Sequence, residues 1–313
     1  MKISVLGPAG SYSEKAALFF FSKVLEKEAD NEMVYFSDIE STVLSLWEKT
    51  GPDFAVIPLE NSIEGAVGIS MDLLNEKEAC IATEIILRID HCLLSLSDSM
   101  DEITAVYSHP QGIYQCRPFL RGRLKNARII ETESTSKAAL LASKDFHAAA
   151  IASADAGKRY GLNVLESGIG SQKNNRTRFV LIYKKQDSQS GFQPDFQSFS
   201  PSDCLSNPVF KYVSENEFKK DETGHLYLKT SVISYLKNDK PGALYHILGA
   251  FFKNDINLTR IESRPSKKEL GDYCFYIDFE GSTSDEHVSK AVEEAKSHSD
   301  RLKILGTYGR LAE

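Results

Sequence analysis

Short apolar runs alternate with amphipathic stretches over residues 1–185 of the chain. The stretches at 14–28 and 136–144 predict helices, because one face of each is apolar. Strands that alternate with helices favour an α/β fold with mostly parallel sheets, and this many strands fit two small lobes better than one sheet. The predicted strands are Ile3–Leu6, Phe54–Pro58, Ile103–Tyr107, Ala127–Glu131, Ala148–Ala152, Asn163–Glu166 and Arg178–Lys184.

Residues 186–224 interrupt this pattern and predict a linker or a mobile excursion. The segment begins Q-D-S-Q-S-G-F-Q-P-D-F-Q-S-F-S-P-S-D, which is polar, rich in Ser and Gln, and interrupted by Gly and Pro. Its aromatic residues Phe192, Phe196 and Phe199 predict that part of it packs on a domain surface.

The end of the chain predicts a small module with the order β-α-β-β-α-β. Residues 226–236 and 303–309 predict its first and last strands, and 256–265 and 272–280 predict the two strands between. A second helix is predicted at 286–295. This order of elements over roughly 80 residues is the ferredoxin-like arrangement.

The first helix of that module is predicted to begin in the stretch N-D-K-P-G-A-L. Asn238 or Asp239 can cap it, and Pro241 suits its first position. Apolar residues spaced by three and four then predict one apolar face. They are Leu244, Ile247, Leu248, Phe251 and Phe252.

Composition and charge narrow the class of protein. The 313 residues are 42% hydrophobic and 26% charged, which is typical of a globular protein with buried cores, and the net charge of −7 argues against a nucleic-acid binder. No apolar run approaches the roughly 18 residues that a membrane span needs. Because M-K-I-S-V-L-G-P enters a strand directly, no signal peptide is predicted and a cytoplasmic location is expected.

The cysteines and histidines predict neither disulfides nor a metal site. The five cysteines include no C-x-x-C pair, and the seven histidines form no H-E-x-x-H motif. Reduced thiols are therefore expected, with no metal and no cofactor. The cysteines are Cys80, Cys92, Cys116, Cys204 and Cys274.

Polar residues gather where predicted strands end and helices begin. After the first strand, Ser11 and Glu14 in G-P-A-G-S-Y-S-E have the spacing of a capping box, and a helix that starts there suits an anion. After the second strand, P-L-E-N-S-I-E-G brings Glu60, Asn61 and Ser62 together. Each group is equally compatible with an ordinary helix start or polar turn.

Two later strand ends have the same character. Y-S-H-P-Q contains Ser108 and Gln111 around His109, and E-T-E-S-T-S-K contains Ser134 and Thr135. A lone histidine is more often structural or solvated than catalytic, although it titrates near neutral pH. Small hydroxyls and amides at several helix starts, without a cofactor fingerprint, favour a site for a small carboxylate-bearing ligand between two lobes.

N-N-R-T-R-F, residues 174–179, places one threonine between two arginines at the start of a strand. Thr177 is either a β-branched strand residue or a hydroxyl that faces a substrate. Arg176 and Arg178 either bind a ligand carboxylate, which a guanidinium matches bidentately, or form structural ion pairs. The residues alone leave these alternatives and the reaction open.

These motifs together resemble the prephenate dehydratase family, in which a catalytic domain precedes an ACT regulatory domain. G-P-A-G-S-Y-S-E, P-L-E-N-S-I-E-G, S-H-P-Q, S-T-S-K-A-A and N-N-R-T-R-F occur in the family's order. In the C-terminal module, G-A-L at 242–244 and E-S-R-P at 262–265 resemble the family's two phenylalanine-binding motifs. The resemblance covers nearly the whole chain.

The resemblance implies a two-lobed catalytic domain like periplasmic solute-binding proteins, followed by a ferredoxin-like ACT domain. The catalytic domain would occupy 1–185, with lobe one at about 1–78 plus 177–185 and lobe two at about 79–176. The linker would occupy 186–224 and the ACT domain 225–313. That linker is longer than the family's usual connection.

The implied reaction is a lyase reaction, the decarboxylative dehydration of prephenate to phenylpyruvate in phenylalanine biosynthesis. Thr177 would act as the hydrogen-bond donor to the departing hydroxyl. Arg178, Asn61 and Ser62 are the other implied catalytic residues. Substrate-binding residues would be Ser11, Glu60, Ser108, Gln111, Ser134, Thr135, Asn175 and Phe179.

The resemblance also implies feedback regulation by phenylalanine, bound between ACT domains of neighbouring subunits in a homodimer or homotetramer. Gly242 at a helix start would let backbone N–H groups approach a carboxylate, and the E-S-R-P strand end would offer charges to an amino acid. The implied effector-binding residues are Gly242, Ala243, Leu244, Glu262, Ser263, Arg264 and Pro265.

Two alternatives remain open at the level of sequence. The same motifs are compatible with an arogenate dehydratase, and the cleft and regulatory module are compatible with a non-catalytic sensor of aromatic amino acids. No stretch resembles a chorismate mutase helix bundle or a dinucleotide-binding domain, so a monofunctional enzyme is expected.

Overall fold

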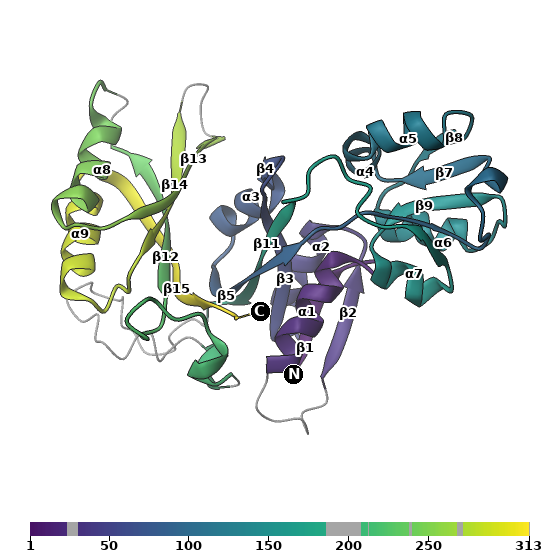
Figure 1. The fold of residues 1–313 in the computed structure, drawn as a ribbon. Coiled ribbons are helices and arrows are strands. Elements are labelled where there is room, and N and C mark those ends of the chain that lie inside the picture. The colour runs from purple at the N-terminus through teal and green to yellow at the C-terminus, as the bar shows by residue number, and fades with distance from the viewer. Residues whose placement is uncertain (24–30, 186–207, 212, 238–239, 268–271, 313) are drawn as a thin grey trace. The chain divides into compact units, whose positions relative to one another are not determined.

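The computed structural model describes residues 1–23, 31–185, 208–211, 213–237, 240–267 and 272–312 (Figure 1). These residues form two compact units. The first unit contains 1–19, 31–67 and 86–179, and the second contains the described residues of 20–30, 68–85 and 180–313.

The first lobe of unit one is built on a parallel sheet that begins at the N-terminus. In the order β11-β3-β1-β2, the central strand β1 runs parallel to both β2 and β3, and its Ile3 and Val5 are fully buried. A short β4 folds back on the end of β3. The elements are β1 (Lys2–Leu6), α1 (Tyr12–Lys23), β2 (Glu32–Phe36), α2 (Ile39–Leu44), the 3-10 turn η1 (Ser45–Trp47), β3 (Phe54–Asn61), β4 (Gly65–Ala66) and β11 (Arg176–Lys184). The residues of α1 from Phe20 on and of β11 from Val180 on are counted with unit two.

The second lobe has its own sheet, with the order β10-β6-β9-β7-β8. β7 is parallel to β8 and β9, whereas β6 is antiparallel to β9 and β10. The central strand A-A-A-I-A is wholly buried, and its small side chains let helices lie close to the sheet. The elements are β6 (Cys92–Ser95), η2 (Met100–Glu102), β7 (Ala105–Ser108), α4 (Pro110–Gln115), α5 (Arg117–Arg123), β8 (Arg128–Glu131), α6 (Thr135–Ala142), β9 (Ala148–Ala152), α7 (Ala154–Tyr160) and β10 (Asn163–Glu166).

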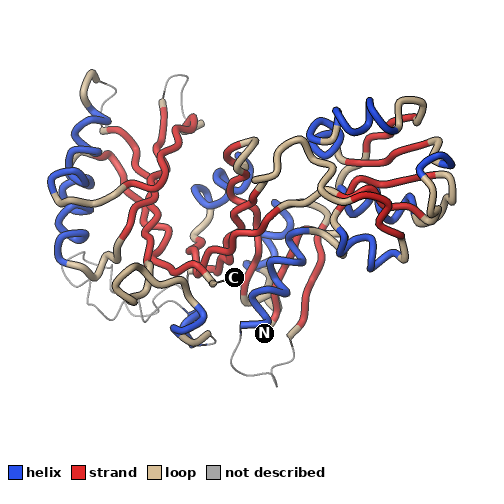
Figure 2. Tube along the Cα trace, in the orientation of Figure 1, coloured by secondary structure: helices blue, strands red, loops and turns tan. Residues whose placement is uncertain are grey.

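Unit two contains the predicted β-α-β-β-α-β module. Its antiparallel strands have the order β13-β14-β12-β15, and α8 and α9 cover one face of them (Figures 1 and 2). Ile247 and Phe251 of α8 and Val288 of α9 are buried in the core below those helices. The elements are β12 (Leu228–Leu236), α8 (Ala243–Lys253), β13 (Leu258–Pro265), β14 (Tyr273–Glu280), α9 (Glu286–Ser297) and β15 (Ser299–Arg310).

Two elements from the middle of the chain also belong to unit two. Helix α3 (Gly68–Glu76) contacts the module, and the first part of β5 (Ala79–Arg88) pairs in parallel with the end of β15 through Thr83 and Glu84. The prediction from the sequence had placed all residues before 186 with the catalytic domain. By contacts these two segments lie in the same compact unit as the regulatory module, and the predicted domain limits stay a prediction.

The predicted α/β class and the β-α-β-β-α-β order are confirmed, but four strands were missed: β2, the two-residue β4, β5 and β6. β5 and β6 are buried at almost every position, so they lack the alternation that marks a half-buried strand, and β2 is short and half exposed. Several boundaries also shift. β3 continues through Asn61 and β11 begins two residues earlier than predicted, at Arg176, so both strands include candidate site residues.

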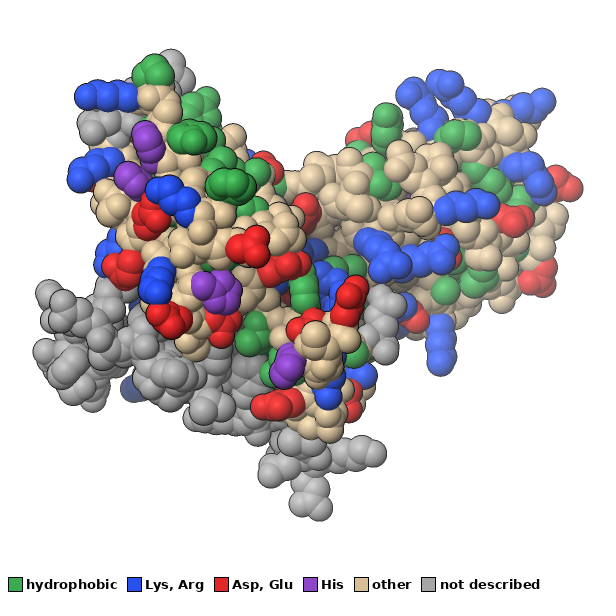
Figure 3. Space-filling view, turned by 60° about the vertical axis from the view of Figure 1, so that its left-hand side comes forward, with side chains coloured by type: hydrophobic (Ala, Val, Ile, Leu, Met, Phe, Trp, Pro, Cys, Tyr) green, Lys and Arg blue, Asp and Glu red, His purple; other side chains and the backbone are tan. Residues whose placement is uncertain are grey.

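The start and the apolar face of the first regulatory helix differ from the prediction. The helix begins at Ala243 with Gly242 as its N-cap, so Pro241 lies before the helix, and Asn238 and Asp239 lie outside the described residues. Phe252, predicted to share the buried face, is 85% exposed. Figure 3 shows hydrophobic side chains of this kind on the surface of the module.

The described part of the predicted linker is packed. Within 208–224 the chain forms the 3-10 turns η5 (Pro208–Lys211) and η6 (Glu215–Glu217), and Val213 and Phe218 are buried. Phe218 forms a β-bridge with Leu311, so a mobile excursion is wrong for this part. Phe192, Phe196, Phe199 and the predicted end of the helix at 24–28 lie outside the described residues.

Gly306 allows β15 to approach β5 closely, and replacing it should destabilise unit two. Its φ is +136°, and an added Cβ would lie 2.7 Å from the carbonyl oxygen of Ile81. We expect Gly306→Ala to lower the free energy of unfolding by roughly 1–3 kcal/mol, measured by chemical denaturation. Gly122→Ala is the matched control, because its Cβ would meet nothing within 4 Å. Equal stability of the two variants would contradict this account.

Candidate active site

The first candidate residues that the structure brings together are Asn61, Asn175 and Thr177. The Asn61 side-chain oxygen accepts hydrogen bonds from the backbone N–H groups of Ile63 (2.9 Å) and Glu64 (3.2 Å). These bonds fix the orientation of the amide, so its Nδ2 donates to Asn175 Oδ1 (2.7 Å) and to Thr177 Oγ1 (2.9 Å). The Thr177 oxygen is therefore an acceptor here, and its own proton can be donated elsewhere.

The same amide chain continues into the second lobe. Asn175 Nδ2 donates to Gln115 Oε1 (2.9 Å), and His91 Nε2 lies 2.9 Å from the same oxygen. Because that oxygen can only accept, the His91 proton lies on Nε2. All five residues of this network are buried: the amides of Asn61, Asn175 and Gln115, the imidazole of His91, and Thr177, which is 8% exposed. The structure thus links a residue of β3, the crossing into β11, and α4 in one polar network.

Gln115 and His91 were absent from the prediction. Gln115 lies four residues after Gln111 in Q-G-I-Y-Q, a spacing that places two amides on one side of a helical turn. That spacing is the signal that could have identified Gln115. His91 follows Asp90 at the start of β6, and nothing in the local sequence distinguishes it from a core histidine.

His91 is held neutral by its surroundings. Burial lowers the pKa of His91 below its ordinary value of 6.5, although the hydrogen bond to Gln115 acts in the opposite direction. Among the described residues its Nδ1 has no hydrogen-bond partner. A proton added there would leave a buried charge without an acceptor.

Thr177 and Arg178 point to opposite faces of β11, because side chains alternate along a strand. On one face Thr177 meets Asn61, and on the other Arg178 Nη1 lies 3.8 Å from Glu60 Oε2. The Arg178 side chain is 9% exposed and that of Glu60 is 38% exposed. Among the alternatives left open for Arg178, the structure therefore contains an ion pair, and Arg176 is exposed.

Ser62 holds the crossing segment in place. Its Oγ donates to the carbonyl oxygen of Asn174 (3.2 Å) and accepts from the Arg176 N–H (2.9 Å), while its own N–H donates to the Arg176 carbonyl oxygen (2.8 Å). Phe179, two residues further along β11, is 2% exposed and lies in the core. Ser62 thus fixes the backbone on either side of Asn175.

The N-terminal loop uses its polar groups within unit one. Ser11 Oγ donates to the Leu6 carbonyl oxygen (2.8 Å) and accepts from the Glu14 N–H (3.1 Å), which is one half of the predicted capping box. The other half differs, because the Glu14 carboxylate accepts from the Gly10 N–H. Glu14 is buried and also lies 3.5 Å from Arg159 of α7 in the second lobe.

The remaining candidates of the second lobe lie at strand ends and helix starts. Ser108 is fully buried, and its Oγ donates to the Ile151 carbonyl oxygen (2.9 Å). Ser134 caps α6, and Thr135 is that helix's first residue. His109 caps α4 by accepting from the Gln111 N–H (3.3 Å), which assigns this histidine a structural contact.

The candidate effector residues lie at two places in unit two. Gly242 has φ +89° and precedes Ala243 and Leu244 at the start of α8. Glu262, Ser263 and Pro265 lie on β13 with Arg264, whose Nη2 is 3.0 Å from Asp72 Oδ1. The guanidinium that the sequence assigns to an amino-acid ligand therefore already contacts a carboxylate of α3.

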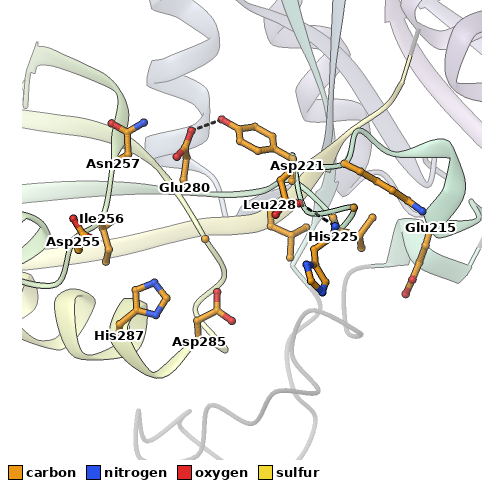
Figure 4. A pocket seen from close by; sticks show the side chains of 15 residues that line it. Glu215, Asp221, His225, Leu228, Asp255, Ile256, Asn257, Glu280, Asp285 and His287 are labelled. Atoms are coloured by element: carbon orange, nitrogen blue, oxygen red, sulfur yellow. Dashed lines mark hydrogen bonds between the residues drawn. The ribbon is translucent and has the colours of Figure 1, made fainter.

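A cavity of about 810 Å³ lies elsewhere in unit two. Figure 4 shows its charged side chains, which come from the segment before β12, the loop before β13 and the region after β14. The predicted cleft and effector residues are absent from its lining. The acids that it contains include Asp221 and Glu280, which accept hydrogen bonds from Thr223 and Tyr227.

The fold and the site define a two-lobed α/β protein with a C-terminal regulatory module, and comparisons with known proteins specify it further. The chain belongs to the prephenate dehydratase family: that family's profile matches residues 3–187, and the ACT domain profile matches 231–296. The resemblance identified from the motifs is thereby confirmed. Among the described residues, no helix has the length and apolar character to cross a membrane.

Individual relatives cover nearly the whole chain. The bifunctional chorismate mutase/prephenate dehydratase of Aquifex aeolicus is 37% identical over 98% of this chain and 73% of its own length. The prephenate dehydratase of Methanocaldococcus jannaschii is 36% identical over 96% of this chain and 95% of its own. Among solved structures, an Arthrobacter aurescens prephenate dehydratase in complex with L-Phe matches with a TM-score of 0.77 and 27% sequence identity. The match covers 99% of this chain and 90% of that chain.

The buried His91 should make stability depend on pH. As the pH falls below about 6.5, the unfolded chain binds a proton at His91 that the folded protein resists, so the free energy of unfolding decreases. We expect this decrease, measured by urea denaturation at about pH 7.5 and about pH 5.5, to be smaller in His91→Gln. His109→Gln is the control, because His109 is only half-buried. Equal decreases in wild type and His91→Gln would contradict the prediction.

Proposed function

We propose that this protein is a prephenate dehydratase and converts prephenate to phenylpyruvate. The observation that carries the proposal is the Asn61 amide, whose contact with Thr177 Oγ1 leaves the hydroxyl proton to be donated. Family membership and the names of the closely matching relatives support the same reaction. Thr177, Asn61 and Asn175 are the residues that we assign to its centre.

The reaction needs one well-placed donor. Prephenate carries a ring carboxylate and, across the ring, an allylic hydroxyl. When the bond from the ring to the carboxylate breaks, its electrons form the aromatic ring and CO2 leaves, while the hydroxyl departs with its bonding electrons and takes up a proton to become water. Charge develops on that departing oxygen, and a donor that stabilises it lowers the barrier.

Thr177 suits the role of donor rather than acid. A threonine hydroxyl is too weak an acid to transfer its proton outright, but it stabilises developing negative charge through a hydrogen bond. The Asn61 N–H at 2.9 Å polarises the same oxygen and restricts its rotation. Arg178 and Glu60 lie on the opposite face of the two strands from Thr177, and their ion pair at 3.8 Å is proposed to align the strands that carry Thr177 and Asn61.

The other cleft residues are proposed in supporting roles. Ser62 positions the 174–176 crossing, as its three hydrogen bonds indicate, and Gln115 positions Asn175. Ser108 links the end of β7 to β9 and Ser134 caps α6, while Gln111 and Thr135 offer polar groups to a ligand. Ser11 is proposed to act indirectly, because its hydroxyl accepts a hydrogen bond at the start of α1.

Feedback regulation by L-phenylalanine is the second part of the proposal. It is supported by the ACT profile over 231–296 and by the relative that was crystallised with L-Phe. In this chain Gly242 and the E-S-R-P end of β13 are the proposed effector motifs. The positive φ of Gly242 lets the start of α8 present backbone N–H groups without a side chain in the way.

Assembly through the regulatory module is proposed from its exposed surface. Tyr245 and Phe252 of α8 are 74% and 85% exposed, and Ile261 of the end strand β13 is 45% exposed. Large apolar side chains grouped on one module are typical of an interaction surface. A second copy of the module fits here, because β13 pairs only through one edge, with β14, in the described sheet order.

Replacing Thr177 by an isosteric residue tests the reaction. We expect Thr177→Val to lower kcat for phenylpyruvate formation by roughly 10²–10³-fold, because the shape remains while the donor is lost. KM should stay within a few-fold. Thr177→Ser retains the hydroxyl and should keep most of the activity. Unchanged kcat in Thr177→Val would contradict the assignment.

The same assay separates the alternatives. Prephenate and arogenate are compared side by side with the purified wild type. A higher kcat/KM for arogenate would assign the protein to arogenate dehydratases, and turnover of neither substrate with retained phenylalanine binding would favour a sensor.

The assembly surface has its own test. We expect Phe252→Glu to shift the protein to a smaller oligomer in size-exclusion chromatography with light scattering, because it places a charge in the proposed contact. Phe146→Glu is the matched control, since Phe146 is 50% exposed and lies in the second lobe. An unchanged mass of Phe252→Glu would remove Phe252 from the interface.

A further inference from the structure

Helix α3 is held by side chains from all four strands of the regulatory module. Tyr276 of β14 donates to the Met71 carbonyl oxygen (2.8 Å), and Arg260 of β13 lies 3.2 Å from the Met71 sulfur. Tyr235 of β12 donates to the Asn75 side chain. Met71 and Leu74 are 0% and 1% exposed, so an apolar contact accompanies these bonds.

The C-terminal end of α3 is capped by a buried lysine. Lys303 of β15 is 8% exposed, and its ammonium group donates to the carbonyl oxygens of Leu74 (3.0 Å), Asn75 (3.2 Å) and Lys77 (2.5 Å). A cation at the carbonyl end of a helix satisfies acceptors that the helix leaves unpaired and complements its dipole. This end of α3 is therefore firmly attached to the module.

The N-terminal end of α3 is held by Arg264 of the E-S-R-P motif. Arg264 Nη2 lies 3.0 Å and 3.1 Å from the two carboxylate oxygens of Asp72, and the exposed Lys267 also lies 3.0 Å from Asp72 Oδ2. The helix starts with Gly68, where an added Cβ would lie 2.8 Å from Arg264 Nη1. The absence of a side chain at Gly68 thus lets the guanidinium lie against the first turn of the helix.

A short, fully hydrogen-bonded turn connects this helix start to Asn61. Asn61 pairs with Gly65 and Glu60 with Ala66 in the β3–β4 ladder, and the Val67 N–H donates to the Leu59 carbonyl oxygen (3.0 Å). The next residue, Gly68, begins α3. The chain therefore runs from the start of α3 to Asn61 through a hydrogen-bonded turn.

We infer that α3 couples the E-S-R-P motif to the catalytic centre, and that the Arg264–Asp72 ion pair is the switch. This inference rests on the proposed function, in which an amino acid binds at E-S-R-P. The carboxylate of that ligand and the carboxylate of Asp72 compete for the Arg264 guanidinium. Binding of the ligand therefore changes the hold of Arg264 on α3, and the change reaches Asn61 and Thr177.

Asp72→Asn tests the coupling, because it removes the charge that Arg264 holds and keeps the shape. Feedback coupling typically changes activity or affinity by roughly 5–150-fold. We expect Asp72→Asn without ligand to have the reduced kcat/KM that wild type shows with saturating L-phenylalanine, because the substitution releases Arg264 as the ligand does. L-phenylalanine should change the kcat/KM of this variant by less than about twofold, while the variant still binds L-phenylalanine in calorimetry. Glu76→Gln is the matched control on the same helix, since Glu76 is exposed and pairs with Lys267.

A second variant keeps the charge and disturbs only the contact. In Gly68→Ala the new Cβ displaces the flexible end of Arg264, and we expect a similarly weakened response to L-phenylalanine. The inference is overturned if both variants are inhibited to the same extent as wild type and Glu76→Gln. It is also overturned if Asp72→Asn no longer binds L-phenylalanine, because Asp72 would then belong to the binding site. A wild type that neither binds nor responds to L-phenylalanine removes the proposed regulation itself, and the inference with it.

Discussion

The proposed catalytic centre depends on one constraint, the fixed orientation of the Asn61 side-chain amide. Two backbone N–H groups, from Ile63 and Glu64, bind its oxygen, so its nitrogen can only face Asn175 and Thr177. The direction of every later hydrogen bond follows from this one, through Asn175 and Gln115 to His91. A neutral His91 fits such a chain, because a second proton would add a buried charge that the amides cannot balance.

Much of this centre could be predicted because it lies on motifs at strand ends. Thr177, Asn61 and Ser62 lie in short stretches in which polar residues interrupt an apolar pattern, but their proposed roles come from the resemblance of these stretches to the family's motifs. Gln115 and His91 could not be identified in that way, since 60 residues separate Gln115 from Asn175 and 24 separate it from His91. Local periodicity carries no information about such pairs. Gln115 could at best be suspected from its helical spacing to Gln111.

The prediction of the fold was limited in the same way, because local periodicity identifies some elements and not others. The order β-α-β-β-α-β was readable because each of its elements has a clear period, whereas β5, buried along nearly its whole length, has none. Periodicity also reports which face of a helix is apolar without saying what covers it. Phe252 belongs to the apolar stripe of α8 and is nevertheless 85% exposed. The grouping of α3 with the regulatory module was equally invisible, because Asp72 and Arg264 are 192 residues apart.

In the proposed coupling, the amide chain around Asn61 is the part that a small movement would disturb. A displacement of about 1 Å in a positioning group can cost roughly 10²-fold in rate, since the reacting geometry is narrow. Asn61 is the last residue of β3, and its amide is oriented by the first residues of the turn that leads to α3. The turn that positions the donor is thus the turn that a shift of α3 would disturb. Under the proposed coupling, an effector that alters the hold on Asp72 would not have to close or open a cleft, because rotation of the Asn61 amide would by itself misplace the Thr177 hydroxyl.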